Sequence, residues 1–150
     1  MRVYIASDHG GYWLKDSIKA DLISHGHEVV DVGNSNYDPN DDYPDYVIPL
    51  AEKVAEDIGS VGIIIGRSGN GEAIAANKVK GVRAAICLTE DMARIAREHN
   101  NANILSLGSS FVDIHRAERI IEVFLESMFT QDERHTRRLD KISLYEASKN

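Results

Sequence analysis

Apolar and polar positions along the chain follow two alternating patterns. Short runs of mostly β-branched or aliphatic residues are separated by longer stretches in which apolar residues recur every three or four positions. The short runs predict buried strands, and the longer stretches predict helices that turn one face toward a core. The predicted strands cover residues 2–6, 28–32, 61–65, 84–88 and 104–107.

The stretches between and after these strands predict six helices. Gly26 is suited to end the first helix, Pro49 to kink the second, and Thr89 to cap the fourth. The predicted helices lie near residues 14–26, 46–58, 71–78, 89–99, 117–128 and 133–148. The last of them is highly charged and has few apolar residues, so we expect it to pack against another subunit.

Regular alternation of strands and helices predicts an α/β fold. We expect one Rossmann-like (flavodoxin-like) domain over residues 1–150, with a five-stranded parallel sheet in a three-layer αβα arrangement and an extra C-terminal helix on a partner subunit. Ligands of such folds bind outside the carboxyl ends of the strands, where the strand order reverses. This rule predicts that a ligand binds near residues 7–11, residues 66–72 and the residues after Leu107.

Composition and charge narrow the range of partners. The chain has 150 residues, of which 43% are hydrophobic and 27% charged, as is typical of a globular protein. Its net charge of −7 disfavours nucleic acid, and no run reaches the ~18–20 apolar residues of a membrane span, so we predict neither partner. Cys87 is the single cysteine, and the first apolar run is too short for a signal peptide, which predicts a cytoplasmic protein.

A glycine-rich turn follows the third predicted strand. Its sequence is Gly66-Arg67-Ser68-Gly69-Asn70-Gly71-Glu72. Glycines let several backbone N–H groups point at one spot, which can hold a phosphate or the oxyanion that develops during a reaction. Because a carboxylate repels a phosphate, Glu72 favours a reaction centre in which it is the base, kept ionised by the helix dipole. The alternative is a plain tight turn with an acidic residue in the first helical turn.

Two further groups are suited to sugar chemistry. Asp8 and His9 end the first strand, where they can orient hydroxyl groups or a phosphate, or can simply be a helix cap and a surface histidine. His99 and Asn100 end the fourth helix, where a histidine can move protons near neutral pH or only complement the helix dipole. We expect Glu72, the Asp8–His9 pair and His99 to face one cleft.

Positive charge gathers near the C-terminus. Arg134 and Arg138 lie one helical turn apart, which is unfavourable unless an anion sits between them, and arginine forks bind phosphate oxygens well. Arg137 can pair with Glu133 and is interpreted as structural, and a solvated helix face is the alternative for the whole group. No set of histidines and acids along the chain has metal-ligand spacing, so no metal is predicted.

Taken together, these segments resemble the type B ribose-5-phosphate isomerases, a family that also includes galactose-6-phosphate and allose-6-phosphate isomerases. The resemblance runs from residue 1 to about residue 146 and is carried by five ordered motifs. They are Ser7-Asp8-His9-Gly10-Gly11, Ser68-Gly69-Asn70-Gly71-Glu72, Ile74-Ala75-Ala76-Asn77-Lys78, Arg97-Glu98-His99-Asn100-Asn101-Ala102 and Arg134-His135-Thr136-Arg137-Arg138.

The resemblance implies an aldose–ketose isomerase that interconverts D-ribose 5-phosphate and D-ribulose 5-phosphate through a cis-enediolate, without metal or organic cofactor. Many members have a catalytic cysteine where this chain has Gly66, whereas others have a glutamate where it has Glu72. By resemblance, Glu72 is the base and His99 helps to open the sugar ring. The implied substrate-binding residues are Asp8, His9, Ser68, Gly69, Asn70, Gly71, Asn100, Arg134, His135 and Arg138. Of these, Arg134 and Arg138 would reach the phosphate from the neighbouring subunit of a homodimer or of a dimer of dimers.

Two positions depart from the family pattern. Arg67 stands where a glycine is usual, and Ser110 stands where many members have an arginine that helps to bind phosphate. We hypothesise that Arg67 reaches the same phosphate from the loop. The alternatives are an isomerase of another phosphosugar, such as a tetrulose, allose or galactose phosphate, or a phosphosugar-binding module without turnover.

Overall fold

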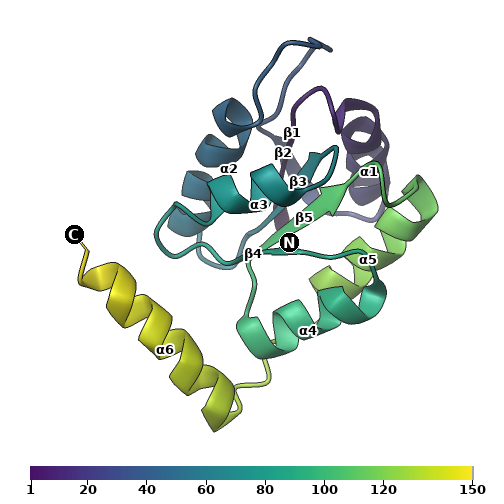
Figure 1. The fold of residues 1–150 in the computed structure, drawn as a ribbon. Helices are drawn as coiled ribbons and strands as arrows, with labels where there is room; N and C mark the ends of the chain where they lie inside the picture. The colour runs from purple at the N-terminus through teal and green to yellow at the C-terminus, as the bar shows by residue number, and fades with distance from the viewer. Residues whose placement is uncertain (150) are drawn as a thin grey trace.

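The predicted strands form one parallel sheet, which the computed structural model describes over residues 1–149 (Figure 1). The strands are β1 (Arg2–Ser7), β2 (Glu28–Asp31), β3 (Val61–Gly66), β4 (Ala84–Ile86) and β5 (Ile104–Gly108). Their order is β2-β1-β3-β5-β4, and each pair of neighbours runs parallel. The predicted fold class is therefore confirmed, although β4 ends at Ile86 rather than at residue 88.

The predicted helices are also present, with shifted ends. They are α1 (Tyr12–Ser24), α2 (Pro44–Glu56), α3 (Asn70–Ala76), α4 (Glu90–Asn100), α5 (Ile114–Glu126) and α6 (Glu133–Ala147). Helix α2 begins at Pro44, earlier than predicted, because proline suits a first helical turn, whose N–H groups are unpaired in any case. Helix α5 begins early because the Asp113 side chain accepts a hydrogen bond from the Arg116 backbone N at 2.8 Å.

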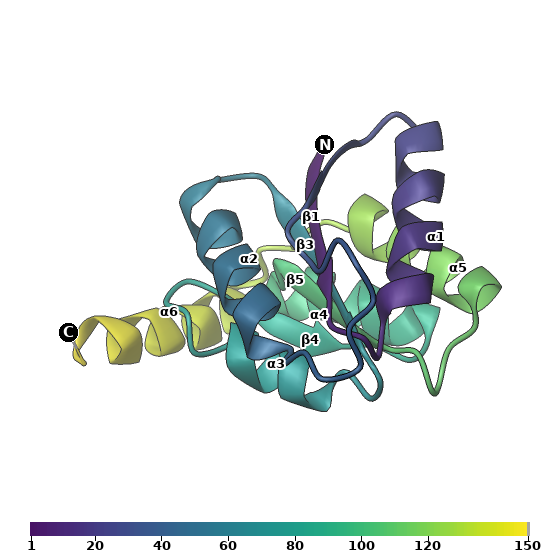
Figure 2. The ribbon, with the colours of Figure 1, turned by 90° about the horizontal axis from the view of Figure 1, so that it is seen from above.

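Helices cover both faces of the sheet (Figure 2). Successive side chains of a strand point to opposite faces, so Ile63 and Ile65 pack with α1, α4 and α5 while Ile64 packs with α2 and α3. All three of these isoleucines are completely buried. This double cover is why β3 consists almost entirely of apolar residues, as its sequence pattern predicted.

The switch point of the sheet lies between β1 and β3. The chain passes from β1 to β2 on one side and then crosses back to β3 on the other, and the register pairs Ser7 with Ile65 and Gly66 with Gly108. The carboxyl ends of β1, β3 and β5 therefore lie side by side, and the loops that leave them meet at one edge of the sheet.

Helix α6 stands apart from the sheet (Figure 1). Of its residues, His135 is the one that is buried, while Leu144 and Tyr145 are 70% and 66% exposed. One contact near its C-terminal end joins the Glu146 carboxylate to the backbone N of Gly81, at 3.2 Å. The helix is thus poorly packed on its own chain, and its packing on a partner subunit stays a prediction.

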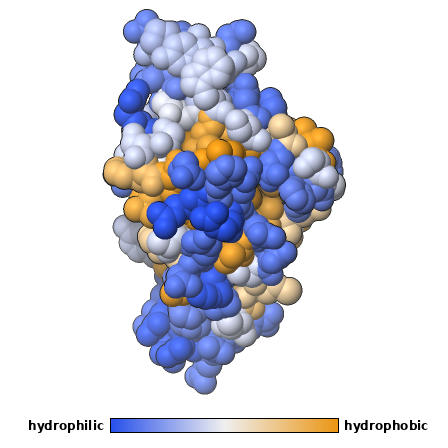
Figure 3. Space-filling view, turned by 90° about the vertical axis from the view of Figure 1, so that its right-hand side faces the viewer, coloured by the Kyte–Doolittle hydropathy of each residue, from blue (hydrophilic) through white to orange (hydrophobic). Residues whose placement is uncertain are grey.

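The surface agrees with the charged composition. On the side shown in Figure 3, hydrophilic residues dominate and the apolar ones form separate patches near the middle. Among the helices that the structure describes, none combines the length and the apolar character that crossing a membrane requires.

Candidate active site

Three loops are locked together at the carboxyl edge of the sheet. A Cβ atom on Gly11 would lie 2.3 Å from the backbone O of Ile65, and one on Gly108 would lie 2.5 Å from the backbone O of Ser68. Only glycine permits such close approaches. The Ser109 hydroxyl adds a hydrogen bond to the backbone O of Gly10 at 2.6 Å. These contacts fix the loops after β1, β3 and β5 relative to one another.

The loop between β3 and α3 turns through a left-handed glycine. Gly69 has φ +81° and is the N-cap residue of α3, and its backbone O accepts a hydrogen bond from the buried Ser106 hydroxyl at 2.7 Å. The Ser68 hydroxyl accepts a hydrogen bond from the Asn70 backbone N at 3.2 Å, so this amide is already engaged. The predicted anion-hole residues, 68–71, therefore form one compact turn.

Glu72 projects from α3 back onto the end of β3. Its side chain is buried, with 4% exposed, and a Cβ on Gly66 would lie only 1.6 Å from its Oε1 atom. The carboxylate thus occupies the space that a side chain at position 66 would fill. The missing side chain of Gly66 is what makes room for it.

The surroundings of Glu72 raise the pKa of its carboxyl above the usual range. Burial is the main cause and the negative charge of Asp8 adds to it, while the backbone N–H groups of Glu72 and Gly69 act in the opposite direction. The sequence analysis expected the helix dipole to keep this carboxylate ionised and did not include burial, which acts in the opposite direction. A raised pKa makes the carboxylate a stronger base.

Asp8 and His9 lie at the same edge, as predicted. The Asp8 Oδ1 atom accepts a hydrogen bond from the Gly10 backbone N at 2.8 Å, and the Asp8 side chain is almost fully buried. His9 is bound twice by Asp41, whose Oδ1 atom lies 2.7 Å from the ring Nδ1 and 2.8 Å from the backbone N. The bond to Asp41 raises the pKa of His9, helped by the charge of Asp8 and opposed by burial.

Asp41 is a site residue that the sequence analysis missed. It lies in the Asn- and Asp-rich loop between β2 and α2, 32 positions from His9, and resembles an ordinary turn residue there. Together with Asp8 and His9 it forms the one group of three acids and histidines in residues 1–149 whose ligand atoms lie within 4.8 Å of one another. A metal ion would have to compete with Asp41 for the Nδ1 atom of His9, so the arrangement suits an ion pair better than a metal site.

A second group of predicted residues gathers where α4 meets α6. The rings of His99 and His135 are stacked, with centroids 4.2 Å apart and planes 15° apart. Burial lowers the pKa of His135, and the charges of His99 and Arg134 lower it further. Arg134 and Arg138, also predicted, lie near enough for their charges to lower the pKa of His135, and Asn100 follows His99 at the end of α4.

The topology separates the two groups within one chain. Helix α4 starts beyond the carboxyl end of β4 and returns to the amino end of β5, so His99 lies about 14 Å along the helix axis from its start at Glu90. Glu72 and Asp8 lie at the opposite, carboxyl edge. One chain therefore does not bring His99 to Glu72, contrary to the expectation of a single cleft, because the βα connection carries the two ends of α4 to opposite edges of the sheet.

Arg67 lies between the loops after β1 and β5. Its backbone O accepts a hydrogen bond from the backbone N of Ser110 at 3.0 Å, so the two positions that depart from the family pattern are neighbours. Its side chain is exposed, and within residues 1–149 its guanidinium has no ion-pair partner. A positive charge is thus available beside position 110.

Comparison with known proteins shows a close relationship to sugar-phosphate isomerases. Residues 3–142 match the family model described as Ribose/Galactose Isomerase. Ribose-5-phosphate isomerase B of Mycobacterium tuberculosis is 44% identical over 146 residues, which are 97% of this chain and 90% of that protein. The probable ribose-5-phosphate isomerase B of Mycoplasma genitalium is 45% identical over 145 residues, or 96% of this chain and 95% of that protein.

Solved structures agree with the sequence comparison. The crystal structure of ribose-5-phosphate isomerase B from Mycoplasma genitalium with bound ribulose-5-phosphate has a TM-score of 0.93 at 44% identity, covering 97% of this chain and 96% of that chain. Ribose-5-phosphate isomerase B from Clostridium thermocellum has a TM-score of 0.92 at 43% identity and covers both chains completely, at 100% each. The similarity therefore extends over both groups of site residues.

Proposed function

The chain belongs to the ribose/galactose isomerase family and is a sugar-phosphate isomerase, and from this premise we propose that it interconverts D-ribose 5-phosphate and D-ribulose 5-phosphate with Glu72 as the base. Its relatives support this substrate by name, and one was solved with ribulose-5-phosphate bound. The single observation that carries the role of Glu72 is its buried carboxylate, which lies against Gly66 at the switch point of the sheet.

The reaction moves one hydrogen between two carbons. Glu72 takes the proton from C2 of the open-chain aldose, and the electron pair of that C–H bond forms the double bond of a cis-enediolate while the carbonyl oxygen at C1 gains negative charge. Those amides of residues 68–71 that are not engaged by the Ser68 hydroxyl or by Glu72 stabilise this charge, as in other oxyanion holes. After a proton moves between the two oxygens, Glu72 returns its proton to C1, and the ketose results.

The alternative base in this family, a thiolate, has no counterpart at this site. Position 66 is glycine, and Cys87 lies just beyond β4, where burial raises the pKa of its thiol to about 12. That thiol is therefore protonated near neutral pH. Glu72 is the group whose raised pKa, burial and position suit proton abstraction.

The second group of residues completes the site from a neighbouring copy. We place His99, Asn100, Arg134, His135 and Arg138 of one subunit against the Glu72 centre of the other, in a homodimer or a dimer of dimers. The support is that these residues gather at the opposite edge from Glu72 and that the apolar residues of α6 lie exposed on their own chain. A two-fold axis would apply such a contact twice and form two equal sites.

Arg67 supplies positive charge in place of the arginine that is missing at position 110. The hydrogen bond between the backbones of residues 67 and 110 places the two side chains at neighbouring points of the same edge. If the positive charge stands at position 67 instead of position 110, a cation is still present at this edge to bind a phosphate. The Arg67 guanidinium extends from a different loop than a side chain at position 110 would. This difference favours the second candidate substrate, a phosphosugar of another length.

Substrate exchange with solvent tests the proposal. Purified protein is incubated in D₂O with a panel of pentose, tetrose and hexose phosphates, and deuterium at C2 is followed by NMR while product is measured in a coupled assay. We expect ribose 5-phosphate to react, and Glu72→Gln to lower kcat by about 10²–10⁴-fold because a positioned base is lost. The matched control is Glu52→Gln, on the exposed face of α2.

The outcomes separate the candidates. Turnover of Glu72→Gln near that of the wild type would remove Glu72 from the role of base. Turnover of a tetrose or hexose phosphate in place of ribose 5-phosphate would support the second candidate. Binding without exchange at C2 would show a phosphosugar-binding module.

A cytoplasmic location stays a prediction from the single cysteine.

A further inference from the structure

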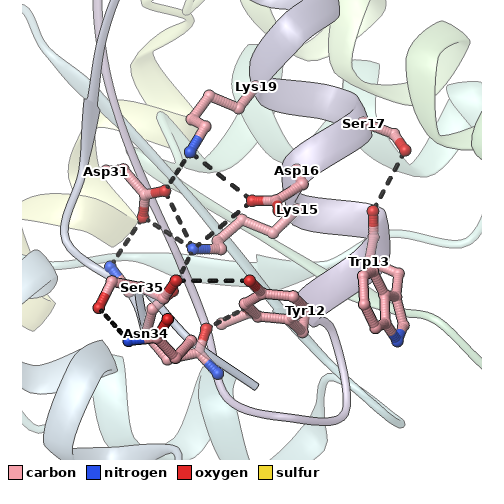
Figure 4. Close-up of polar contacts among 12 residues, drawn as sticks. Tyr12, Trp13, Lys15, Asp16, Ser17, Lys19, Asp31, Asn34 and Ser35 are labelled. Carbon is pink, nitrogen blue, oxygen red and sulfur yellow. Dashed lines mark hydrogen bonds and ion pairs between the residues drawn. The ribbon is translucent and has the colours of Figure 1, made fainter.

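A lysine is buried between α1 and the sheet. Lys15 has 1% of its side chain exposed, and its ammonium lies 3.0 Å from both carboxylate oxygens of Asp31 and 2.7 Å from the backbone O of Asn34 (Figure 4). The two Asp31 oxygens and the Asn34 backbone O are three acceptors, and the ammonium group has three N–H donors for them. A buried charge is costly unless it is paired and hydrogen-bonded, as it is here. The proposed reaction gives this ion no role, so its place in the fold requires another explanation.

The chain wraps around this ammonium where β2 ends. The backbone N of Gly33 donates a hydrogen bond to Asp31 Oδ1 at 3.0 Å. A Cβ on Gly33 would lie 2.8 Å from the backbone N of Ser7 and 3.2 Å from Cδ of Lys15. The start of the β2–α2 loop is therefore clamped between the stem of Lys15 and the end of β1, which carries the site.

A chain of hydrogen bonds leads from this clamp to the site. The Asn34 side chain donates to Asp41 Oδ2 at 2.9 Å, and the Ser7 hydroxyl lies 3.3 Å from Asn34 Oδ1. The other oxygen of Asp41 binds the ring and the backbone N–H of His9. Asn34 is 4% exposed, so water competes little for these bonds.

We infer that Lys15 is a positioning residue, which holds the β2–α2 loop through Asn34 so that Asp41 fixes the His9 ring at the substrate site. The inference rests on the proposed function at one point, which is that His9 contacts the sugar. A lysine buried between α1 and the sheet thus acts on the site through Asn34 and Asp41, without touching the substrate.

Lys19 provides a matched control on the same helix. Its ammonium also pairs with Asp31, at 2.8 Å, but its side chain is 35% exposed, and Asn34 is not among its hydrogen-bond partners in residues 1–149. Removing either lysine takes one positive charge from Asp31. Only the removal of Lys15 takes the donor from the backbone O of Asn34.

The test compares Lys15→Met with Lys19→Met and follows the His9 ring by NMR titration, assigned through His9→Gln. In the wild type, Asp41 and Asp8 face the His9 ring and raise its pKa, while Glu72 faces Asp8. These groups are present in both variants, so a change in the titration reports the position of Asp41.

We expect Lys15→Met to bring the pKa of His9 back toward its ordinary value and to lower kcat/KM by about tenfold or more, since small displacements of site groups have effects of that size. Lys19→Met is expected to leave both quantities unchanged. An unaltered His9 titration in a folded Lys15→Met protein would overturn the inference, and so would an equal effect in both variants, which would trace the effect to Asp31.

Asn34→Ala is the second variant should Lys15→Met not fold. It removes the donor to Asp41 and leaves the backbone O that Lys15 binds, so the same change in the titration of His9 is expected, and an unaltered titration overturns the inference. The NMR readout is independent of turnover. A wild type that does not isomerise ribose 5-phosphate would therefore refute the proposed function while the titration still decides the role of Lys15.

Discussion

A methyl group added at Gly66 tests the proposed site most directly. In Gly66→Ala the new Cβ would lie 1.6 Å from Oε1, 2.0 Å from the carboxyl carbon and 2.6 Å from Oε2 of Glu72. Non-bonded atoms rest at roughly 3.5 Å, so the carboxylate has to move by about 2 Å. Since a misplacement of about 1 Å can cost about 10²-fold in rate, we expect kcat to fall by at least that factor.

The fold should survive this substitution. The nearest atoms to the new methyl group belong to the flexible end of the Glu72 side chain, with no backbone atom among them. We expect a loss of about 1–3 kcal/mol in the free energy of unfolding, as for other overpacked sites. Thermal unfolding followed by circular dichroism checks the stability, and a coupled assay at saturating ribose 5-phosphate gives kcat.

A shorter carboxylate provides the control. Adding Glu72→Asp to Gly66→Ala withdraws the carboxyl group by one methylene, so the double variant should turn over faster than Gly66→Ala alone, although Glu72→Asp by itself is expected to be slow. Such non-additivity is the sign of direct contact. A folded Gly66→Ala protein with the kcat of the wild type would refute the reasoning, because the observed position of Glu72 would then be irrelevant to turnover.

Three further results are expected. Asp41 raises the pKa of His9, so the stability that this histidine adds is fully present below its unfolded pKa of about 6.5 and is lost as pH rises through the raised value. His9→Gln should therefore lower the urea midpoint at about pH 6 and much less at about pH 9, and an equal loss at both would contradict this. Arg67→Ala should raise KM for ribose 5-phosphate with little change in kcat, and an unchanged KM would refute the exchange with position 110. Inactive Glu72→Gln and His99→Asn subunits, when mixed, should regain up to about a quarter of wild-type activity if sites are shared in a dimer. The reason is that half of the dimers are then mixed and each mixed dimer has one intact site. Subunits with self-contained sites would stay inactive after mixing.

Most of the fold was predictable because its signals are local. The strands β1 and β3 are short apolar runs, and the spacing of Ile120, Ile121 and Phe124 marks the buried face of α5. The ends of elements were less predictable. Pro44 starts α2 by suiting its first turn, and β4 is cut to three residues at the edge of the sheet.

The positions of site residues that depend on the order of the strands were predictable. Those that depend on contacts between residues far apart in the sequence were not. The switch-point rule brought Asp8 and Glu72 to one edge, as the structure shows. The same rule says nothing about Lys15 or Asp41, whose partners lie 16 and 32 positions away. The burial that raises the pKa of Glu72 is likewise a property of packing and has no sign in the residues around position 72.

The contact between Glu72 and Gly66 also limits how a family of this kind can change over time. A cysteine and a glutamate cannot both occupy the space at the end of β3, because the first side-chain atom at position 66 already overlaps the carboxylate. On the proposed role of Glu72, a lineage that gains a cysteine at position 66 therefore displaces the carboxylate in the same step, as Gly66→Ala is expected to do. On that role, the substitution weakens the glutamate-based catalyst at once, so the two reactive groups exclude each other at the end of β3.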